Sequence, residues 1–395
     1  MNKTKRLIAL LLALALVLGL AACGGSDKSA EKKPAEKTEE KKPAEEKTEE
    51  KKPADAKAVE FDENSLYLIT DLGTIDDKSF NQGSFEGLKK FAEENKLEAK
   101  YLRPAGEGDQ IYKQAIDAAI DAGAKIVVTP GFLFESAVGE AQVQYPDVKF
   151  IAVDFEPKEG DNYKVGPNTT SILYKEEQSG FLAGYAAVKD GYTKLGFMGG
   201  LAVPAVVKYG FGFIAGANYA AEEMGINVEV KYNYTGVFEP KPEINTMASS
   251  WYKGGTEVIF SCGGGIAASI LKAAQDNGGK MIGVDVDQKD MGEEVITSAM
   301  KNLTKSVYES TKSVKDGSFQ GGKTQKLGVE SKGVQISEDF SRFKTFTKAD
   351  YDAIYAKLVA NENGLTDSIP NDSSNEDPTS FQDKMNKVKI EFIQQ

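Results

Sequence analysis

Short apolar runs alternate with amphipathic stretches along residues 64–294, and each apolar run stops at or just before a glycine, proline or aspartate. The runs are LYLI, KYL, IVVT and FIAV in the first half and LGFM, VEVKYNY, VIF and MIGV in the second. Apolar runs of this length with turn residues at their ends predict buried strands. Helical spacing in between predicts helices near residues 82–95, 110–121, 176–188, 212–224 and 265–277.

Strands that alternate with helices form parallel sheets with right-handed crossovers. Two batches of about four strands therefore predict an α/β fold with two doubly wound parallel-sheet lobes. We expect a further helix over Val295–Val314 and a strand pair over Lys326–Ile336. The expected lobes are residues 61–190 with 295–320, and residues 191–294 with 321–395.

The loop after the first predicted strand is the richest in polar side chains. It reads TDLGTIDDKSFNQG and contains Asp71, Asp77, Phe80 and Asn81. In parallel sheets such loops lie at the carboxyl ends of strands, where ligands collect. The alternative interpretation is that Asp77 and its neighbours only cap the following helix, but that role does not require Asp71, Phe80 and Asn81 as well.

This loop resembles the signature of the basic membrane protein family of bacterial lipoproteins, which are substrate-binding proteins of ABC importers, several of them for purine nucleosides. The resemblance continues at Gly236-Val237-Phe238, Gly263-Gly264-Gly265, Gly283–Gln288 and Thr297–Lys301. It implies a periplasmic-binding-protein type I-like fold whose hinge crossovers join the two lobes. Two departures from the family are Glu239, where relatives often carry Asp, and a longer tail after about residue 345.

The resemblance also implies a set of ligand-binding residues. Phe80 and Phe238 would enclose a purine between two aromatic rings, while Asp71 and Asp77 would accept its N–H donors. Asp285 and Lys301 would bind ribose hydroxyls. The expected ligand-binding residues are Asp71, Asp77, Phe80, Asn81, Phe238, Gly264, Asp285 and Lys301. The same groups would also suit a sugar or a flavin-like heterocycle.

Three other motifs have weaker support. Gly317–Thr324 fits the P-loop pattern, but a helix is predicted before it and a strand after it, the reverse of what a phosphate loop needs. The glycines of Gly210–Ala215 are better explained by close helix packing than by dinucleotide binding. Lys289 occupies a position in the Asp285-Val-Asp287 loop where calcium would need an oxygen ligand, so we expect no metal and no cofactor.

Composition excludes several classes of function. The net charge of −12 argues against a nucleic-acid partner. The chain has no histidine, which excludes Ser-His-Asp and Cys-His catalysis. Its two cysteines, Cys23 and Cys262, give no disulfide framework. Adjacent carboxylates on one loop do not make a glycosidase pair, so we expect a binding protein without catalytic residues rather than an anchored enzyme.

The N-terminal region has the pattern of a signal peptide over residues 1–22. Basic residues precede an apolar run from Leu7 to Leu20, which is shorter than a membrane span requires. Leu20-Ala21-Ala22-Cys23 resembles a lipobox, which implies acylation of Cys23, palmitate included. Residues 23–60 contain the repeat EKTEEKKPA, at 36–44 and 46–54, and have almost no large apolar side chains, so they predict a disordered tether.

These observations predict an extracytoplasmic lipoprotein at the cell membrane. We expect a monomer that binds a purine nucleoside between its lobes and delivers it to the permease and ATPase subunits of an ABC importer. A sensor-type receptor remains an alternative, because the partner is not encoded in this chain.

Overall fold

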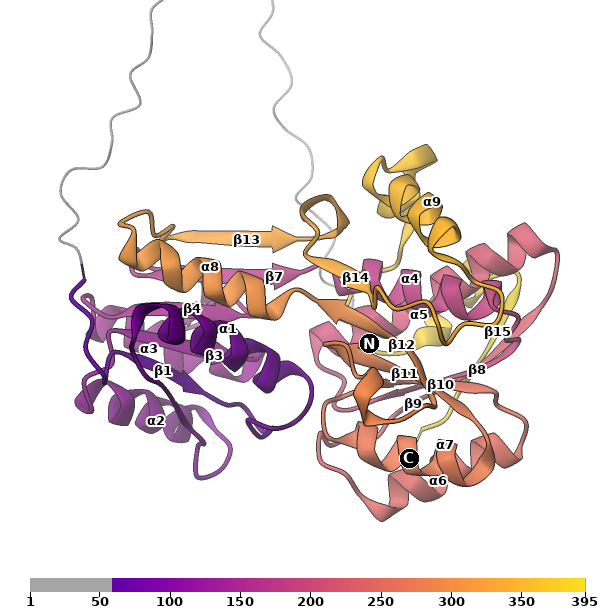
Figure 1. The fold of residues 1–395 in the computed structure, drawn as a ribbon, viewed down its shortest axis with the longest axis horizontal. Coiled ribbons are helices and arrows are strands. Elements are labelled where there is room, and N and C mark those ends of the chain that lie inside the picture. The colour runs from indigo at the N-terminus through magenta and orange to yellow at the C-terminus, as the bar shows by residue number, and fades with distance from the viewer. Residues whose placement is uncertain (1–58, 395) are drawn as a thin grey trace, which may run out of the picture. The chain divides into compact units, whose positions relative to one another are not determined.

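The computed structural model describes residues 59–394. The predicted signal peptide, Cys23 and nearly all of the predicted tether lie outside the described residues. Residues 59–394 form two mainly parallel sheets with helices on both faces of each (Figure 1). The predicted α/β fold of two doubly wound lobes is therefore confirmed.

The first sheet has the strand order β13-β7-β4-β3-β1-β2, and all its neighbouring pairs are parallel. Side chains alternate between its faces: Leu66 and Leu68 join one apolar cluster, and Tyr67 and Ile69 join another. Helices α1 and α8 pack on the first face, and α2 and α3 on the second. The bounds are β1 Leu66–Ile69, α1 Phe80–Asn95, β2 Ala99–Leu102, α2 Asp109–Asp121, β3 Ile126–Pro130, α3 Glu135–Gln144, β4 Lys149–Val153, β7 Thr169–Tyr174, α8 Leu303–Lys315 and β13 Lys323–Leu327. A small hairpin, β5 Lys158–Glu159 with β6 Asn162–Tyr163, follows β4.

The second sheet has the order β14-β12-β11-β10-β8-β9-β15, and only β14 runs antiparallel to its neighbour. Helices α4 and α5 contribute to the apolar cluster on one face, and α6 and α7 to the cluster on the other. The bounds are α4 Glu176–Lys189, β8 Lys194–Gly199, α5 Pro204–Met224, β9 Val228–Tyr234, α6 Pro242–Lys253, β10 Val258–Cys262, α7 Ile266–Asn277, β11 Lys280–Asp285, β12 Val295–Lys301, β14 Val334–Ile336, α9 Lys348–Val359 and β15 Val388–Phe392. Among the helices of residues 59–394, none combines the length and the apolar character that a membrane span requires.

The chain passes between the two sheets three times, as the expected lobes require, but the crossings lie at other residues than expected. Helix α4 packs on α5 of the second lobe. Residues 295–301 form a strand of the second sheet, and only residues 303–315 form the helix of the first lobe. Strand β13 belongs to the first sheet and does not pair with β14. The error at residues 295–301 has a physical reason. Strand β12 is buried almost throughout, so its sequence lacks the alternation of apolar and polar residues that would distinguish it from the helix that follows.

Helices α4 and α5 approach each other unusually closely because glycines face the partner backbone. A Cβ atom on Gly180 would lie 2.1 Å from the carbonyl oxygen of Tyr209, and one on Gly212 would lie 1.9 Å from that of Glu177. Gly184 and Gly216 repeat the arrangement one turn further along each helix. Close helix packing, the use predicted for Gly212, is confirmed. This contact fixes α5, whose first turns face the cleft, against α4.

Candidate functional site

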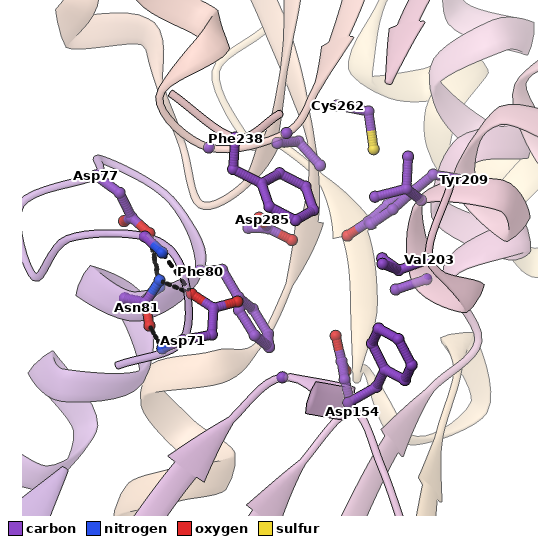
Figure 2. Close-up of a pocket in the computed structure, with 18 of the residues that line it drawn as sticks. Asp71, Asp77, Phe80, Asn81, Asp154, Val203, Tyr209, Phe238, Cys262 and Asp285 are labelled. Carbon is purple, nitrogen blue, oxygen red and sulfur yellow. Dashed lines mark hydrogen bonds between the residues drawn. The ribbon is translucent and has the colours of Figure 1, made fainter. Parts of the chain in front are cut away.

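A cavity lies between the carboxyl ends of the two parallel sheets (Figure 2). It contains about 770 Å³ of empty space, part of which is open to solvent. All of the ligand-binding residues expected from the sequence line it, namely Asp71, Asp77, Phe80, Asn81, Phe238, Gly264, Asp285 and Lys301. The parallel topology explains this convergence, since the loops after β1, β10, β11 and β12 all leave their sheets on the cleft side.

Asp71, Asp77 and Asn81 form a hydrogen-bonded group on the first-lobe side (Figure 2). The Asn81 side-chain amide donates to Asp71 Oδ1 at 2.8 Å and to Asp77 Oδ2 at 3.0 Å. Asp77 also accepts from the backbone N–H groups of Ser79, Asn81 and Gln82. The capping interpretation is therefore correct for Asp77, whose oxygens serve the start of α1.

Asp71 is left with more capacity for a ligand. Its Oδ1 accepts from Asn81 and from the Gly73 N–H, but among the described residues no hydrogen bond reaches Oδ2. Gly131, with φ 109°, leaves room for this carboxylate, because a Cβ atom there would lie 3.0 Å from Oδ2. Burial raises the pKa of Asp71 to about 6, so the group is mainly an ionised acceptor at neutral pH.

Phe80 and Phe238 approach the cavity from different lobes (Figure 2). Phe80 is the first residue of α1, and Phe238 lies in the loop between β9 and α6. Both rings are only partly buried, unlike ordinary core phenylalanines such as Phe197. Gly200 makes room for the second ring, since a Cβ atom there would lie 2.4 Å from Phe238. Two rings with free surface facing one cavity suit a flat, apolar ligand group.

Lys301, at the end of β12, lies among three carboxylates. Its ammonium forms an ion pair with Asp154 and lies 3.3 Å from Glu176 Oε1 and 3.9 Å from Asp285 Oδ1. It also lies 5.0 Å from the ring centroid of Phe80. Burial acts to lower the pKa of Lys301, but the carboxylates outweigh burial and raise it. Lys301 is therefore a buried permanent cation at the base of the cavity.

Asp285 links the two lobes directly. Its Oδ2 accepts a 2.6 Å hydrogen bond from the Ser79 hydroxyl, while Gln288 donates to the Lys78 carbonyl. Burial raises the pKa of Asp285, although the nearby Lys301 cation opposes this. Its remaining oxygen pairs only loosely with Lys301 and lines the cavity.

Three residues of this region are absent from the expected set: Asp154 and Tyr209, which line the cavity, and the nearby Glu176. From sequence alone, Asp154 after the strand FIAV fits either a strand-end cap, the favoured interpretation, or a cleft ligand. Within residues 59–394 its buried Oδ1 and the buried Tyr209 hydroxyl have no hydrogen-bond partner, and both side chains line the cavity (Figure 2). The position of Asp154 directly after a buried strand was the signal that could have identified it.

The other walls of the cavity are mainly apolar or backbone. Phe132, Leu133, Val203 and Val206 contribute apolar side chains to the lining. Gly264, with φ 55°, precedes α7, and within the described chain neither its N–H nor that of Gly265 donates a hydrogen bond. Because both residues line the cavity, these N–H groups at the start of a helix are free to donate to a ligand.

Two sequence features have no part in this cavity. Lys323 and Thr324 begin strand β13 and do not open a helix, so the P-loop pattern lacks its structural context. Glu239, the departure from the family pattern, is exposed and lies 3.9 Å from Arg103 of the other lobe.

Comparison with known proteins identifies the family. A family model described as "ABC transporter substrate-binding protein PnrA-like" (Bmp) matches residues 65–364. The chain is 28% identical over 318 residues to the ABC transporter nucleoside-binding protein BmpA of Lactococcus lactis subsp. cremoris, covering 74% of this chain and 87% of that protein. It is 28% identical over 295 residues to basic membrane protein A of Borreliella burgdorferi, covering 73% and 84%.

Solved structures support the fold. A solute-binding protein of an ABC transporter system from Aeropyrum pernix K1 matches with a TM-score of 0.63 and 23% identity, over 81% of this chain and 86% of that one. A similar protein from Conexibacter woesei DSM 14684 matches with a TM-score of 0.61 and 20% identity, over 75% and 97%.

The family model spans most of the described chain, and the resemblance noted in the sequence is confirmed. Family members are extracytoplasmic substrate-binding proteins and not enzymes, which also confirms the expectation that this chain is not an enzyme. The chain belongs to the Bmp family of PnrA-like ABC transporter substrate-binding proteins.

Proposed function

We propose that this substrate-binding protein takes a purine nucleoside into the cavity between its lobes. One observation carries the proposal: two partly buried aromatic rings from different lobes face a cavity that has the free Asp71 oxygen and, separately, the Lys301 cluster. The rings would enclose the base, and Asp71 would accept its N–H donors. Asp285 and Lys301 would bind the ribose hydroxyls. The name of the Lactococcus relative agrees with this ligand class.

Calorimetry against a ligand panel tests the proposal. The panel contains inosine, guanosine and adenosine, their free bases, ribose, a hexose and riboflavin. We expect the nucleosides to bind at micromolar concentration or below, about 8 kcal/mol or more of binding free energy. Binding of sugars or riboflavin without nucleosides would contradict the ligand assignment. Nucleoside should be recovered intact after long incubation, because the site has no assigned catalytic role.

We propose that the mature protein is anchored through acylated Cys23 and hands its ligand to the permease and ATPase of an ABC importer. The motivation is the signal-type sequence that ends in Leu20-Ala21-Ala22-Cys23. Acyl chains on one residue, followed by a polar tether, would hold the lobes near the membrane surface. Replacing Cys23 with alanine should release the protein from membranes in cell fractionation. Continued membrane retention of that variant would contradict the anchor.

Hinge closure is part of the same proposal, because the three crossovers between the lobes form a natural hinge. Small-angle scattering of the protein with saturating nucleoside should give a smaller radius of gyration than without it.

A further inference from the structure

Glu176 is a buried carboxylate that the proposed binding reaction does not use directly. It begins α4, is only 2% exposed, and does not line the cavity. Oε1 lies 3.3 Å from Lys301, and Oε2 lies 3.6 Å from the ammonium of Lys208 on α5. A carboxylate at the first turn of a helix is also stabilised by the helix dipole. Glu176 therefore approaches Lys301 from behind, on the side away from the ligand space.

The position of Glu176 is important because the other two carboxylates beside Lys301 also face the ligand space. Asp154 and Asp285 line the cavity, and each has an oxygen that no protein donor within residues 59–394 satisfies by a hydrogen bond. An ammonium has three donors and no acceptor. If Asp154 and Asp285 turn their oxygens to ligand hydroxyls, Lys301 loses part of the negative charge that balances its buried ammonium. Glu176 keeps one carboxylate beside the buried cation whether or not a ligand is present.

The first turn of α4 also touches all three crossovers. Glu176 follows the β7–α4 crossover, and its partner Lys301 ends β12 just before the crossover to α8. Gln178 accepts a 2.8 Å hydrogen bond from the backbone N–H of Val329, in the crossover from β13 to β14. The Glu176–Lys301 contact therefore lies where the lobes must pivot.

We infer that Glu176 is a positioning residue, which holds the Lys301 ammonium at the hinge so that Asp154 and Asp285 are free to bind the hydroxyl groups of the ligand. The inference rests on the proposed binding of nucleosides. Glu176 acts only through Lys301 and makes no ligand contact. Its removal should therefore weaken the sugar-dependent part of binding and leave the base-dependent part unchanged.

The test compares Glu176→Gln with Glu177→Gln. Glu177 is the neighbouring residue and is also buried, but within the described chain it forms no ion pair. Calorimetry with a nucleoside and its free base is carried out on both variants. We expect Glu176→Gln to weaken nucleoside binding about tenfold or more, as for the loss of a charge-assisted contact. Its base affinity, and both affinities of Glu177→Gln, should stay within about twofold of the unsubstituted protein.

The second part of the test repeats Glu176→Gln and Glu177→Gln in a protein that also contains Lys301→Met. There Glu176→Gln should weaken nucleoside binding no further, because the residue through which Glu176 acts is gone. It should also raise the melting temperature above that of Lys301→Met alone, because it removes a buried carboxylate that has lost a cation. In the presence of Lys301 the same change should lower the melting temperature. This reversal of sign does not depend on ligand binding.

Two results would overturn the inference. One is equal weakening of nucleoside and base by Glu176→Gln, and the other is a melting temperature that falls in both backgrounds. If the unsubstituted protein binds no nucleoside, the proposed function fails, while the stability measurements still decide whether Glu176 supports Lys301.

Discussion

Asp154 directly follows β4 and Asp285 ends β11, in different sheets, and both have left-handed backbone conformations, with φ of 68° and 66°. Both carboxylates lie beside the ammonium of Lys301. Such a conformation is unfavourable for most residues, although aspartate tolerates it better than others. Non-glycine residues in this region cost about 1–3 kcal/mol each and concentrate at functional sites. The pair turns two strand ends toward one cation at the centre of the cleft.

The proposed division of the site into a base end and a ribose end predicts different effects of two substitutions. Asp285→Ala should weaken nucleoside binding more than binding of the free base, by about 1.5–3 kcal/mol for each lost charge-assisted hydrogen bond. Phe238→Ala should weaken both about equally, because both ligands contain the base. Isothermal calorimetry measures the four affinities.

Asp287→Asn is the matched control, since Asp287 accepts from Ser337 and does not line the cavity. Equal effects of Asp285→Ala on nucleoside and base would refute this orientation of the ligand.

We expect the buried carboxyl group of Glu177 to make the free energy of unfolding depend on pH. Burial, with a smaller contribution from Glu176, raises the pKa of Glu177 to about 7 from 4.5. A carboxyl whose folded-state pKa is raised adds stability below its unfolded pKa of 4.5, and this stability is lost as the pH rises through about 7. Glu177→Gln should therefore stabilise the protein at pH 8, by about 1–3 kcal/mol, and flatten its stability between pH 4.5 and 7.

Thermal unfolding followed by circular dichroism across this pH range tests the effect. The same substitution at Glu223, an ion-paired and more exposed glutamate whose pKa is lowered, should not stabilise the protein at pH 8. A Glu177→Gln variant with the pH profile of the unsubstituted protein would contradict the role of burial.

The contact between α4 and α5 predicts a strong steric effect of one methyl group. Gly180→Ala would place a Cβ atom 2.1 Å from the Tyr209 carbonyl, so the helices must separate. We expect a loss of about 2–3 kcal/mol in unfolding free energy, as for overpacking in a rigid core. Gly106→Ala is the control, because a Cβ atom there would meet its nearest neighbour only at 3.4 Å. Urea titration measures both variants, and similar stabilities would show that the helices adjust freely.

The C-terminal segment beyond the family match should contribute to stability. Residues 365–394 follow the matched region and end in β15, which pairs with β9. Phe381 is 8% exposed, and its ring centroid lies 4.8 Å from that of Phe211 on α5. Phe381→Ala should cost about 3–5 kcal/mol. The nearby exposed change Asp383→Ala should leave the melting temperature almost unchanged, and equal effects of the two would contradict a packed segment.

Local patterns predicted most of the site because its residues follow strands. Asp71, Asp285 and Gly264 each lie at or just after the end of an apolar run, and parallel pairing brings such ends together. Asp154, the ion-pair partner of Lys301, was harder to identify from the sequence. Asp154 reads as a cap in its own segment, and only the tertiary fold brings it to a lysine almost 150 residues away.

Prediction from hydrophobic patterns failed most often in buried segments where a strand and a helix follow each other. The helices α3 and α6 were not predicted, although α6 has a clear apolar face. Which sheet β12 and β13 join depends on pairing with strands far away in the sequence, and the local sequence pattern does not predict that pairing. Glu176 is polar and follows a strand, so neither composition nor spacing distinguishes it from an exposed cap.

The late position of β13 has a consequence for the order in which the molecule can be completed. One edge strand of the first sheet is formed by residues 323–327, and the helix α8 that covers one face of this sheet is formed by residues 303–315. Both are made after five of the strands of the second sheet. During synthesis, Leu88 and Phe91 of α1 must wait for Val307 and its neighbours before that apolar face is covered. The first lobe therefore cannot mature as an independent N-terminal unit, and the two lobes reach the native state together through slow, long-range pairing.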